Sequence, residues 1–258
     1  MFKRLQSVFG RAPSAATATP PSIETKPKPK APFYAIGDIH GCLAQMESLI
    51  KQIEAENANA TIVFLGDYID RGTQSAQVLT RLQELQSTQP ERRICLMGNH
   101  ERMMLEFIDD PLGRGARWLV NGGIQTLQSF GINPGTNKPD AEEAMELADQ
   151  LEDALPKGMQ NWLREMPMQW SSGNVHCVHA AMDPSAAPEN QKERHLLWGH
   201  REFMTTPRED GACVVYGHVI VPKPDVRDGR IAIDTGAYKS GRLTAVHIET
   251  DSWRFLQT

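Results

Sequence analysis

The sequence has few cysteines, and none of the spacings through which cysteine often acts. Four occur among 258 residues, and none forms a C-x-x-C pair. Their positions are Cys42, Cys95, Cys177 and Cys213. Three of them lie in apolar runs predicted to be strands, which indicates small buried side chains. This sparse usage fits a reducing compartment, and the expected location is the cytoplasm.

The sequence also lacks a long apolar run and an excess of positive charge. No run reaches the roughly 20 apolar residues that a transmembrane helix needs. The net charge is −5 at pH 7, so electrostatic capture of nucleic acid is not expected. Hydrophobic residues make up 40% of the chain, enough to build one large α/β domain or two small ones.

Residues 1–32 differ in composition from the rest. Residues 12–32 are rich in Ala, Thr, Pro and Lys, which predicts a disordered linker because such a segment cannot bury a core. Residues 1–11 are basic and mildly amphipathic, without the continuous apolar stretch of a secretory signal. We interpret them as an unstructured basic tail, with contact to a membrane or a partner as the alternative. The folded domain is expected to span residues 33–258.

Five short apolar runs each end in Asp, Asn or His. In four of them glycine stands directly before the polar residue, where the backbone can turn sharply. The runs lead into GDIHG at 37–41, GDYIDRG at 66–72, GNHE at 98–101, HA at 179–180 and GH at 217–218. Because α/β sheets bind ligands at the carboxyl ends of their strands, these polar side chains are expected to share one site. Their oxygen and imidazole ligands suit Mn, Fe or Zn.

The spacing of apolar residues predicts the elements between these runs. Residues 43–53 and 75–85 have helical periodicity, so the first hundred residues predict a β-α-β-α-β unit with parallel strands. A further helix is expected over 100–108. About 111–167 is expected to form a helical cap, and the chain after Asn174 is rich in predicted strands. The sequence therefore predicts an α/β fold with two packed sheets flanked by helices.

The five motifs in this order resemble the metallophosphoesterase superfamily, and within it the bacterial and phage-type serine/threonine phosphatases of the phosphoprotein phosphatase family. The resemblance runs from about Phe33 to the end of the chain. It implies the calcineurin-like fold with two mixed sheets. It also implies two divalent ions, Mn being expected first and Fe or Zn next. Such ions lie about 3.5–4 Å apart, share a hydroxide for in-line attack and hold the phosphoryl group between them.

The resemblance implies a role for each residue of the site. The implied metal ligands are Asp38, His40, Asp67, Asn99, His179 and His218. Asp67 would bridge the two ions, and Asn99 would also contact the substrate. His100 would be the general acid, oriented by Asp70. Arg71 would bind phosphate oxygens through two parallel hydrogen bonds.

The second phosphate-binding arginine is the least regular part of the resemblance. Related sequences often have Trp, one residue, then Arg, whereas this chain has Trp198, Gly199, His200 and then Arg201. We assign Arg201, because a guanidinium suits a phosphate oxygen better than a neutral imidazole. The assignment requires a one-residue bulge. Three further histidines are expected to have structural roles only: His176 and His247 in strands, and His195 in a polar loop.

Other functions fit parts of the pattern. Dinucleoside polyphosphate hydrolases of this fold, which act on diadenosine tetraphosphate, tend to have Ala before Arg-Gly and GNHD in place of GNHE. Here Asp70 and Glu101 stand at those positions, which favours a phosphoprotein or phosphopeptide substrate. A broad phosphomonoesterase fits the same residues. A non-catalytic scaffold would have lost ligands or the acid, and all are present. A thiolate tyrosine phosphatase would need a cysteine in an anion-binding loop ending in arginine, which is missing.

Overall fold

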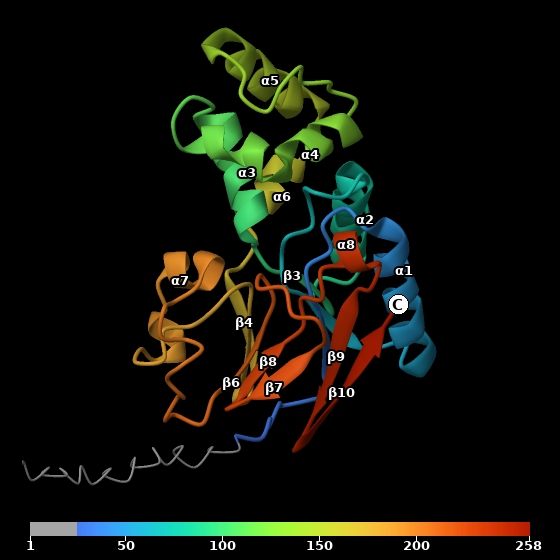
Figure 1. Ribbon diagram of the computed structural model, residues 1–258. Helices are drawn as coiled ribbons and strands as arrows, with labels where there is room; N and C mark the ends of the chain where they lie inside the picture. Colours follow the sequence, from blue (N-terminus) through green and yellow to red (C-terminus); the bar gives the residue numbers. More distant parts are fainter. Residues whose placement is uncertain (1–24) are drawn as a thin grey trace, which may run out of the picture.

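The computed structural model describes residues 25–258, in which two five-stranded sheets pack against each other (Figure 1). The first has the order β10-β9-β1-β2-β3: β1 (Phe33–Ile36), β2 (Thr61–Phe64), β3 (Arg93–Cys95), β9 (Thr244–Glu249) and β10 (Ser252–Gln257). The second has the order β4-β5-β6-β8-β7: β4 (Gln169–Ser172), β5 (Val175–Val178), β6 (Cys213–Tyr216), β7 (Asp225–Arg227) and β8 (Arg230–Ala232). The predicted α/β fold with two mixed sheets is confirmed.

Helices cover the outer faces of the sheets and form the cap, which we define as η1, η2, α4, α5 and α6. The helices before the cap are α1 (Leu43–Glu56), α2 (Ser75–Thr88) and α3 (Asn99–Asp109). The cap contains η1 (Arg114–Ala116), η2 (Leu119–Gly123), α4 (Ile124–Ser129), α5 (Ala141–Ala154) and α6 (Met159–Arg164). The last helices are η3 (Pro188–Asn190), α7 (Glu193–Trp198) and α8 (Ala237–Ser240). In Figure 1, α3 runs from the sheets into the cap above them.

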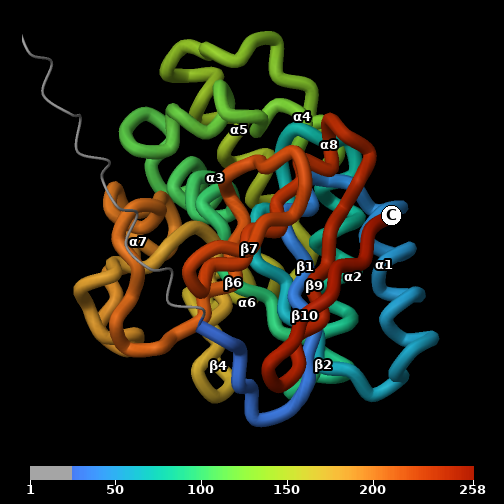
Figure 2. The backbone as a smooth tube through the Cα atoms, turned by 60° about the horizontal axis from the view of Figure 1, so that its bottom comes forward, coloured from blue at the N-terminus to red at the C-terminus, as the bar shows by residue number. Residues whose placement is uncertain are grey.

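Successive side chains along a strand point to opposite faces of the sheet, and both faces are buried in the core. In β1, Phe33 and Ala35 face the second sheet, while Tyr34 and Ile36 face the helices. β1, β2 and β3 are parallel to one another. From the far end of the chain, β9 pairs antiparallel with β1, and β10 pairs with β9 (Figure 2). In the second sheet, β5 is parallel to β6. The loops that follow these parallel strands carry the five motifs.

β4 was not predicted from the sequence, and β7 was not either. β4 has the sequence Gln-Trp-Ser-Ser and lies at the edge of its sheet, paired only with β5. β7 is three residues long and lies at the opposite edge. Short polar edge strands carry little of the apolar alternation on which the prediction depended.

Residues 25–32 are held against the domain, so the prediction of a disordered linker up to residue 32 was wrong for this part. Pro27 is buried, and its carbonyl accepts the backbone N–H of Asp251 at 2.8 Å. The backbone N–H of Lys28 donates to Oδ1 of Asn174 at 2.6 Å. Composition alone does not reveal such partners, because they lie far along the chain. The prediction for residues 1–24 lies outside the described residues. Within residues 25–258, no helix is both long enough and apolar enough to cross a membrane.

Candidate active site

Five residues of the predicted site have a left-handed backbone. Their φ angles are 45° at His40, 52° at Asp67, 71° at Asp70, 66° at Arg71 and 64° at His218. For a residue with a Cβ atom this conformation costs about 1–2 kcal/mol. Such strain persists where the surrounding structure enforces it, and it concentrates at functional sites. The turns after β1, β2 and β6 are therefore shaped to present these side chains.

Backbone hydrogen bonds lock the loop after β1 onto the loop after β2. The carbonyl of Asp67 accepts the N–H groups of Ile39 at 3.0 Å and of His40 at 2.8 Å. Gly72 lies so close that a Cβ atom there would be 2.0 Å from the carbonyl oxygen of His40. Only glycine allows this approach. The two loops consequently hold His40 and Asp67 in fixed relation.

Glu101 anchors the loop after β2 to the start of α3. Its buried carboxylate accepts backbone N–H groups from Asp67 at 2.9 Å, Tyr68 at 2.8 Å, Ile69 at 3.2 Å and Gly98 at 3.1 Å. Burial, followed by the nearby charge of Asp67, raises the pKa of Glu101 to about 8, although the backbone donors act in the opposite direction. From the sequence, Glu101 indicated only the phosphatase branch. Its role in holding the loop after β2 was not predicted.

His40 and His179 present unprotonated nitrogens to the site. Nδ1 of His40 donates to the carbonyl of Ile69 at 2.7 Å, and Nδ1 of His179 donates to that of Leu65 at 3.0 Å. Burial lowers the pKa of His40 to about 3 and that of His179 to about 4. Both rings are therefore neutral, and each Nε2 is left as an acceptor with a lone pair.

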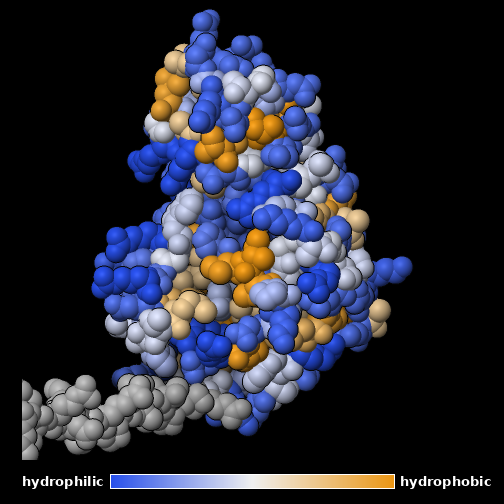
Figure 3. Space-filling model, viewed as in Figure 1, coloured by the Kyte–Doolittle hydropathy of each residue, from blue (hydrophilic) through white to orange (hydrophobic). Residues whose placement is uncertain are grey.

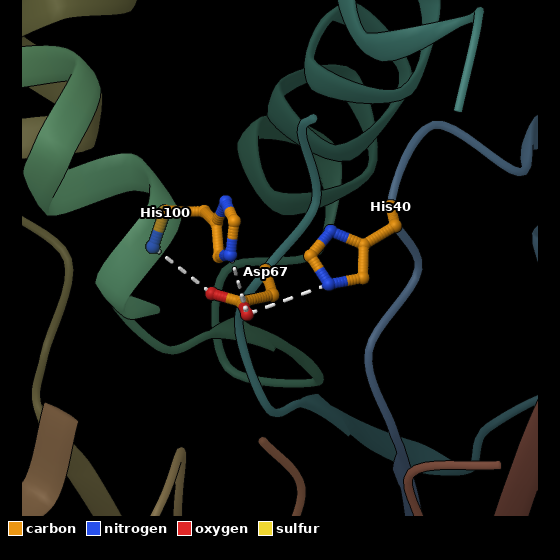
Figure 4. A group of neighbouring side chains, drawn as sticks. All are labelled: His40, Asp67 and His100. Carbon is orange, nitrogen blue, oxygen red and sulfur yellow. Dashed lines mark hydrogen bonds and ion pairs between the residues drawn. The ribbon is translucent and has the colours of Figure 1, made fainter. Parts of the chain in front are cut away.

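These lone pairs face oxygen acceptors, which is the arrangement of a cation site. Nε2 of His40 lies 3.6 Å from Oδ2 of Asp67 (Figure 4). Nε2 of His179 lies 3.3 Å from Oδ1 of Asp67 and 2.8 Å from Oδ1 of Asn99. Lone pairs turned toward one another without a proton between them repel unless a cation lies among them. Neutral imidazole, amide and carboxylate donors fit divalent transition metals.

His218 and Asp38 complete the group of predicted ligands. Ligand atoms of Asp67, His179 and His218 lie within 4.8 Å of one another. The carboxylate of Asp38 accepts the backbone N–H of His218, with distances of 3.1 and 3.0 Å to its two oxygens. Burial and the charges of Asp234 and Asp67 raise the pKa of Asp38 well above its usual range. Several buried carboxylates at one place add negative charge that a metal cation would balance.

His100 and Asp70 form a closely bonded pair. Nδ1 of His100 donates to Oδ2 of Asp70 at 2.5 Å. Burial opposes protonation of His100, but the charge of Asp67 and the bond to Asp70 outweigh it and raise the pKa to about 8. Asp70 also receives the indole N–H of Trp118 and the hydroxyl of Thr126. No local signal in the sequence linked either Trp118 or Thr126 to Asp70.

Arg71 lies between two imidazoles. Its guanidinium nitrogens are 3.0 Å from Nε2 of His40 and 3.1 Å from Nε2 of His100. The guanidinium carbon lies 5.2 Å from the ring centre of Tyr238, another residue that sequence reasoning missed. The positive charge of Arg71 therefore lies against the lone pair of His40, a predicted metal ligand, which again fits a cation site. Figure 3 shows the surface narrowing between the cap and the sheets.

Arg201 is the predicted residue that the structure does not bring to this group. Its side chain is 87% exposed, and among residues 25–258 its ion pair is with Glu202, at 3.1 Å. The side chain of His200 is less exposed than that of Arg201, and its Nε2 lies 3.7 Å from a carboxylate oxygen of Asp183. The prediction that His195 lies in a polar loop was wrong: it is buried in α7. The apolar neighbours of His195 pack α7 into the core beside β6.

Comparison with known proteins gives two groups of relatives. A model of the calcineurin-like phosphoesterase family matches residues 31–241. An asymmetrical bis(5'-nucleosyl)-tetraphosphatase of a Geobacillus species is 27% identical over 234 residues, 81% of this chain and 87% of that protein. Serine/threonine-protein phosphatase 2 of Salmonella typhimurium is 25% identical, over 84% of this chain and 93% of that protein. The crystal structure of a candidate diadenosine tetraphosphatase has a similar fold, with a TM-score of 0.61 at 19% identity over 88% of this chain and 94% of that one.

Proposed function

The chain belongs to the calcineurin-like phosphoesterase family, and we propose that within this family it is a metal-dependent serine/threonine protein phosphatase. The observation that carries the proposal is the bond of 2.5 Å between His100 and Asp70 beside the predicted metal ligands. A serine or threonine alkoxide is a poor leaving group, so its departure benefits strongly from a general acid. An imidazole with a pKa of about 8 is largely protonated at neutral pH and is suited to this task.

Arg71, His100 and Asp70 each have a separate role in the proposed reaction. When the substrate binds, the guanidinium of Arg71 leaves the imidazoles of His40 and His100. It then binds two phosphoryl oxygens, whose spacing matches its two parallel N–H groups. With Arg71 withdrawn, Nε2 of His100 is free to carry the proton. Asp70 keeps Nδ1 of His100 engaged, so that Nε2 donates to the departing serine or threonine oxygen. The products are phosphate and a free hydroxyl group, and no side chain is phosphorylated.

The predicted ligands would hold two divalent cations. They are Asp38, His40, Asp67, Asn99, His179 and His218. When bound, such cations supply Lewis-acid charge for the phosphoryl oxygens and acidify a water molecule. Mn is proposed first, with Fe or Zn as alternatives, since the ligand set accepts all three.

A second candidate function is hydrolysis of bis(5'-nucleosyl) tetraphosphates. The Geobacillus relative with that name, similar over most of both chains, supports it as directly as the Salmonella phosphatase supports the first. The leaving group would then be a nucleotide, whose phosphate departs with little need of a proton. His100 would contribute less to that reaction than to phosphoserine hydrolysis.

The test is a comparison of substrates. Protein stripped with a chelator and resupplied with Mn²⁺ is offered a phosphoserine/phosphothreonine peptide, a phosphotyrosine peptide and diadenosine tetraphosphate. We expect fast phosphate release from the phosphoserine/phosphothreonine peptide and slow cleavage of the dinucleotide. The opposite preference would replace the proposal with the second candidate. Absence of turnover with Mn²⁺, Fe²⁺ and Zn²⁺ would contradict both.

A further inference from the structure

Besides His100, two residues hold the carboxylate of Asp70: Trp118, between η1 and η2, and Thr126 of α4. The indole N–H of Trp118 lies 3.1 Å from Oδ1 and 2.9 Å from Oδ2 of Asp70. The hydroxyl of Thr126 donates to Oδ1 at 2.7 Å and accepts the backbone N–H of Asp70 at 2.9 Å. Asp70, Trp118 and Thr126 are all fully buried. Water therefore does not replace these donors, and both carboxylate oxygens have a fixed direction.

The chain between these two donors contacts the same loop. The carbonyl of Gly122 accepts the backbone N–H of Arg71 at 3.4 Å. Gly122 has a φ angle of 115°, and a Cβ atom there would lie 3.0 Å from the nitrogen of Arg71 and 3.1 Å from Cβ of Asp70. A side chain at Gly123 would meet the ring of Trp118 at 2.6 Å. Residues 118–126 are thus shaped to approach Asp70 and Arg71 closely.

The helix geometry of this segment is unusual as well. Residues Leu119–Gly123 form the π-helical turn η2, with a kink at Gly122. π-Helical turns are less favourable than α-helix and are frequent at functional sites. A helix that only packed against its neighbours would have no need of this turn. The turn allows Trp118 and Thr126, on either side of it, to reach one carboxylate.

We propose that residues 118–126 are a positioning segment of the catalytic machinery, in which Trp118 and Thr126 fix Asp70 and thereby aim the proton of His100. The proposal rests on the acid role assigned to His100 under the proposed function. A carboxylate with two further donors cannot rotate about its last bond, so the imidazole bonded to it keeps one orientation. Productive proton transfer depends on holding such groups within about 0.5 Å of the required geometry.

Two variants remove the donors: Trp118→Phe keeps an aromatic ring at that position, and Thr126→Val keeps the shape of the side chain. Trp118→Phe and Thr126→Val should each lower kcat on a phosphoserine peptide about tenfold, the loss expected from a misplaced acid. Turnover of p-nitrophenyl phosphate should change less than about twofold, because its leaving group departs without a proton. Trp162→Phe is the matched control, since Trp162 also lies in the cap but donates to Gln86 at 3.0 Å. It should leave both rates unchanged.

A double-mutant cycle separates positioning from a merely structural role. In the His100→Asn background, Trp118→Phe should cause no further loss on the peptide, because there is no proton left to aim. Equal losses on both substrates, or a full additional loss in that background, would overturn the proposal. Unchanged rates in both donor variants, with a large loss in His100→Asn alone, would overturn the positioning role and leave the proposed function intact. If His100→Asn leaves peptide turnover unchanged, the acid role fails and this proposal with it.

Discussion

The backbone N–H of His100 donates to Oδ1 of Asp67 at 3.0 Å. The residue expected to deliver the proton is therefore bonded directly to the carboxylate expected to bridge the metals. Figure 4 shows the Asp67 carboxylate between the rings of His40 and His100. This bond is formed at the first turn of α3, where backbone N–H groups have no partner within the helix. Acid and ligand therefore share one rigid support.

Replacing His100 with Asn should remove the acid and leave the predicted metal ligands in place. The backbone bond to Asp67 does not depend on the side chain of His100. Turnover of a phosphoserine peptide should fall about 10²–10⁴-fold, the usual contribution of a general acid. Metal content, measured by elemental analysis, should stay near that of the unaltered protein. An unchanged peptide rate would remove His100 from the acid role.

The pH dependence of turnover should follow the protonation of His100. The pKa of this residue is raised to about 8, so the protonated form dominates below pH 8 and is lost above it. Peptide turnover should consequently decline as the pH rises through about 8. The decline should be weaker with p-nitrophenyl phosphate, whose departure needs no acid. A profile measured from pH 6 to 9.5 that is flat on the peptide would contradict this assignment.

Shortening Glu101 to Asp should lower stability without changing substrate preference. The carboxylate accepts four backbone N–H groups, and an Asp side chain, one methylene shorter, cannot reach all of them. Leaving buried donors unpaired should lower the free energy of unfolding by about 2–3 kcal/mol, measured by urea denaturation. Glu106→Asp, at a surface ion pair with Arg117, should change it by less than about 1 kcal/mol.

The same variant tests the use of Glu101 as a marker of the phosphatase branch. Its partners are backbone groups, which gives it no direct contact through which to select a substrate. The ratio of peptide to diadenosine tetraphosphate turnover should therefore stay constant in Glu101→Asp. A shift of that ratio toward the dinucleotide would mean that the loop held by Glu101 takes part in selecting the substrate.

Replacing Asp67 with Asn should weaken both metals together. Asp67 contacts His40 on one side and His179 on the other, so a lost charge is felt in both halves of the site. Elemental analysis after dialysis against Mn²⁺ should show both ions reduced. Asp109→Asn, which breaks only a surface ion pair with Arg164, is the control and should retain the normal content. Loss of a single ion would argue against a bridging role.

Most site residues named from the sequence lie within a few residues of the end of a strand. Asp67 comes three residues after β2 and Asn99 four after β3, so each was placed by the strand before it. Contacts made only by the folded chain could not be predicted in this way. Trp118 is 48 residues from Asp70, and nothing near it indicates a partner. Arg201 was placed by resemblance to a motif with different spacing, and the structure turns it toward Glu202.

The left-handed residues of the site also bear on the stability of the fold. Glycine adopts this conformation without strain, but at these positions it would remove side chains that are largely buried and hydrogen-bonded. This chain instead keeps His40, Asp67, Asp70, Arg71 and His218 there. Their combined strain, about 5–10 kcal/mol at 1–2 kcal/mol each, is comparable with the whole stability of a typical domain. The rest of the fold therefore has to offset a backbone strain that is present only because these side chains stand at these positions.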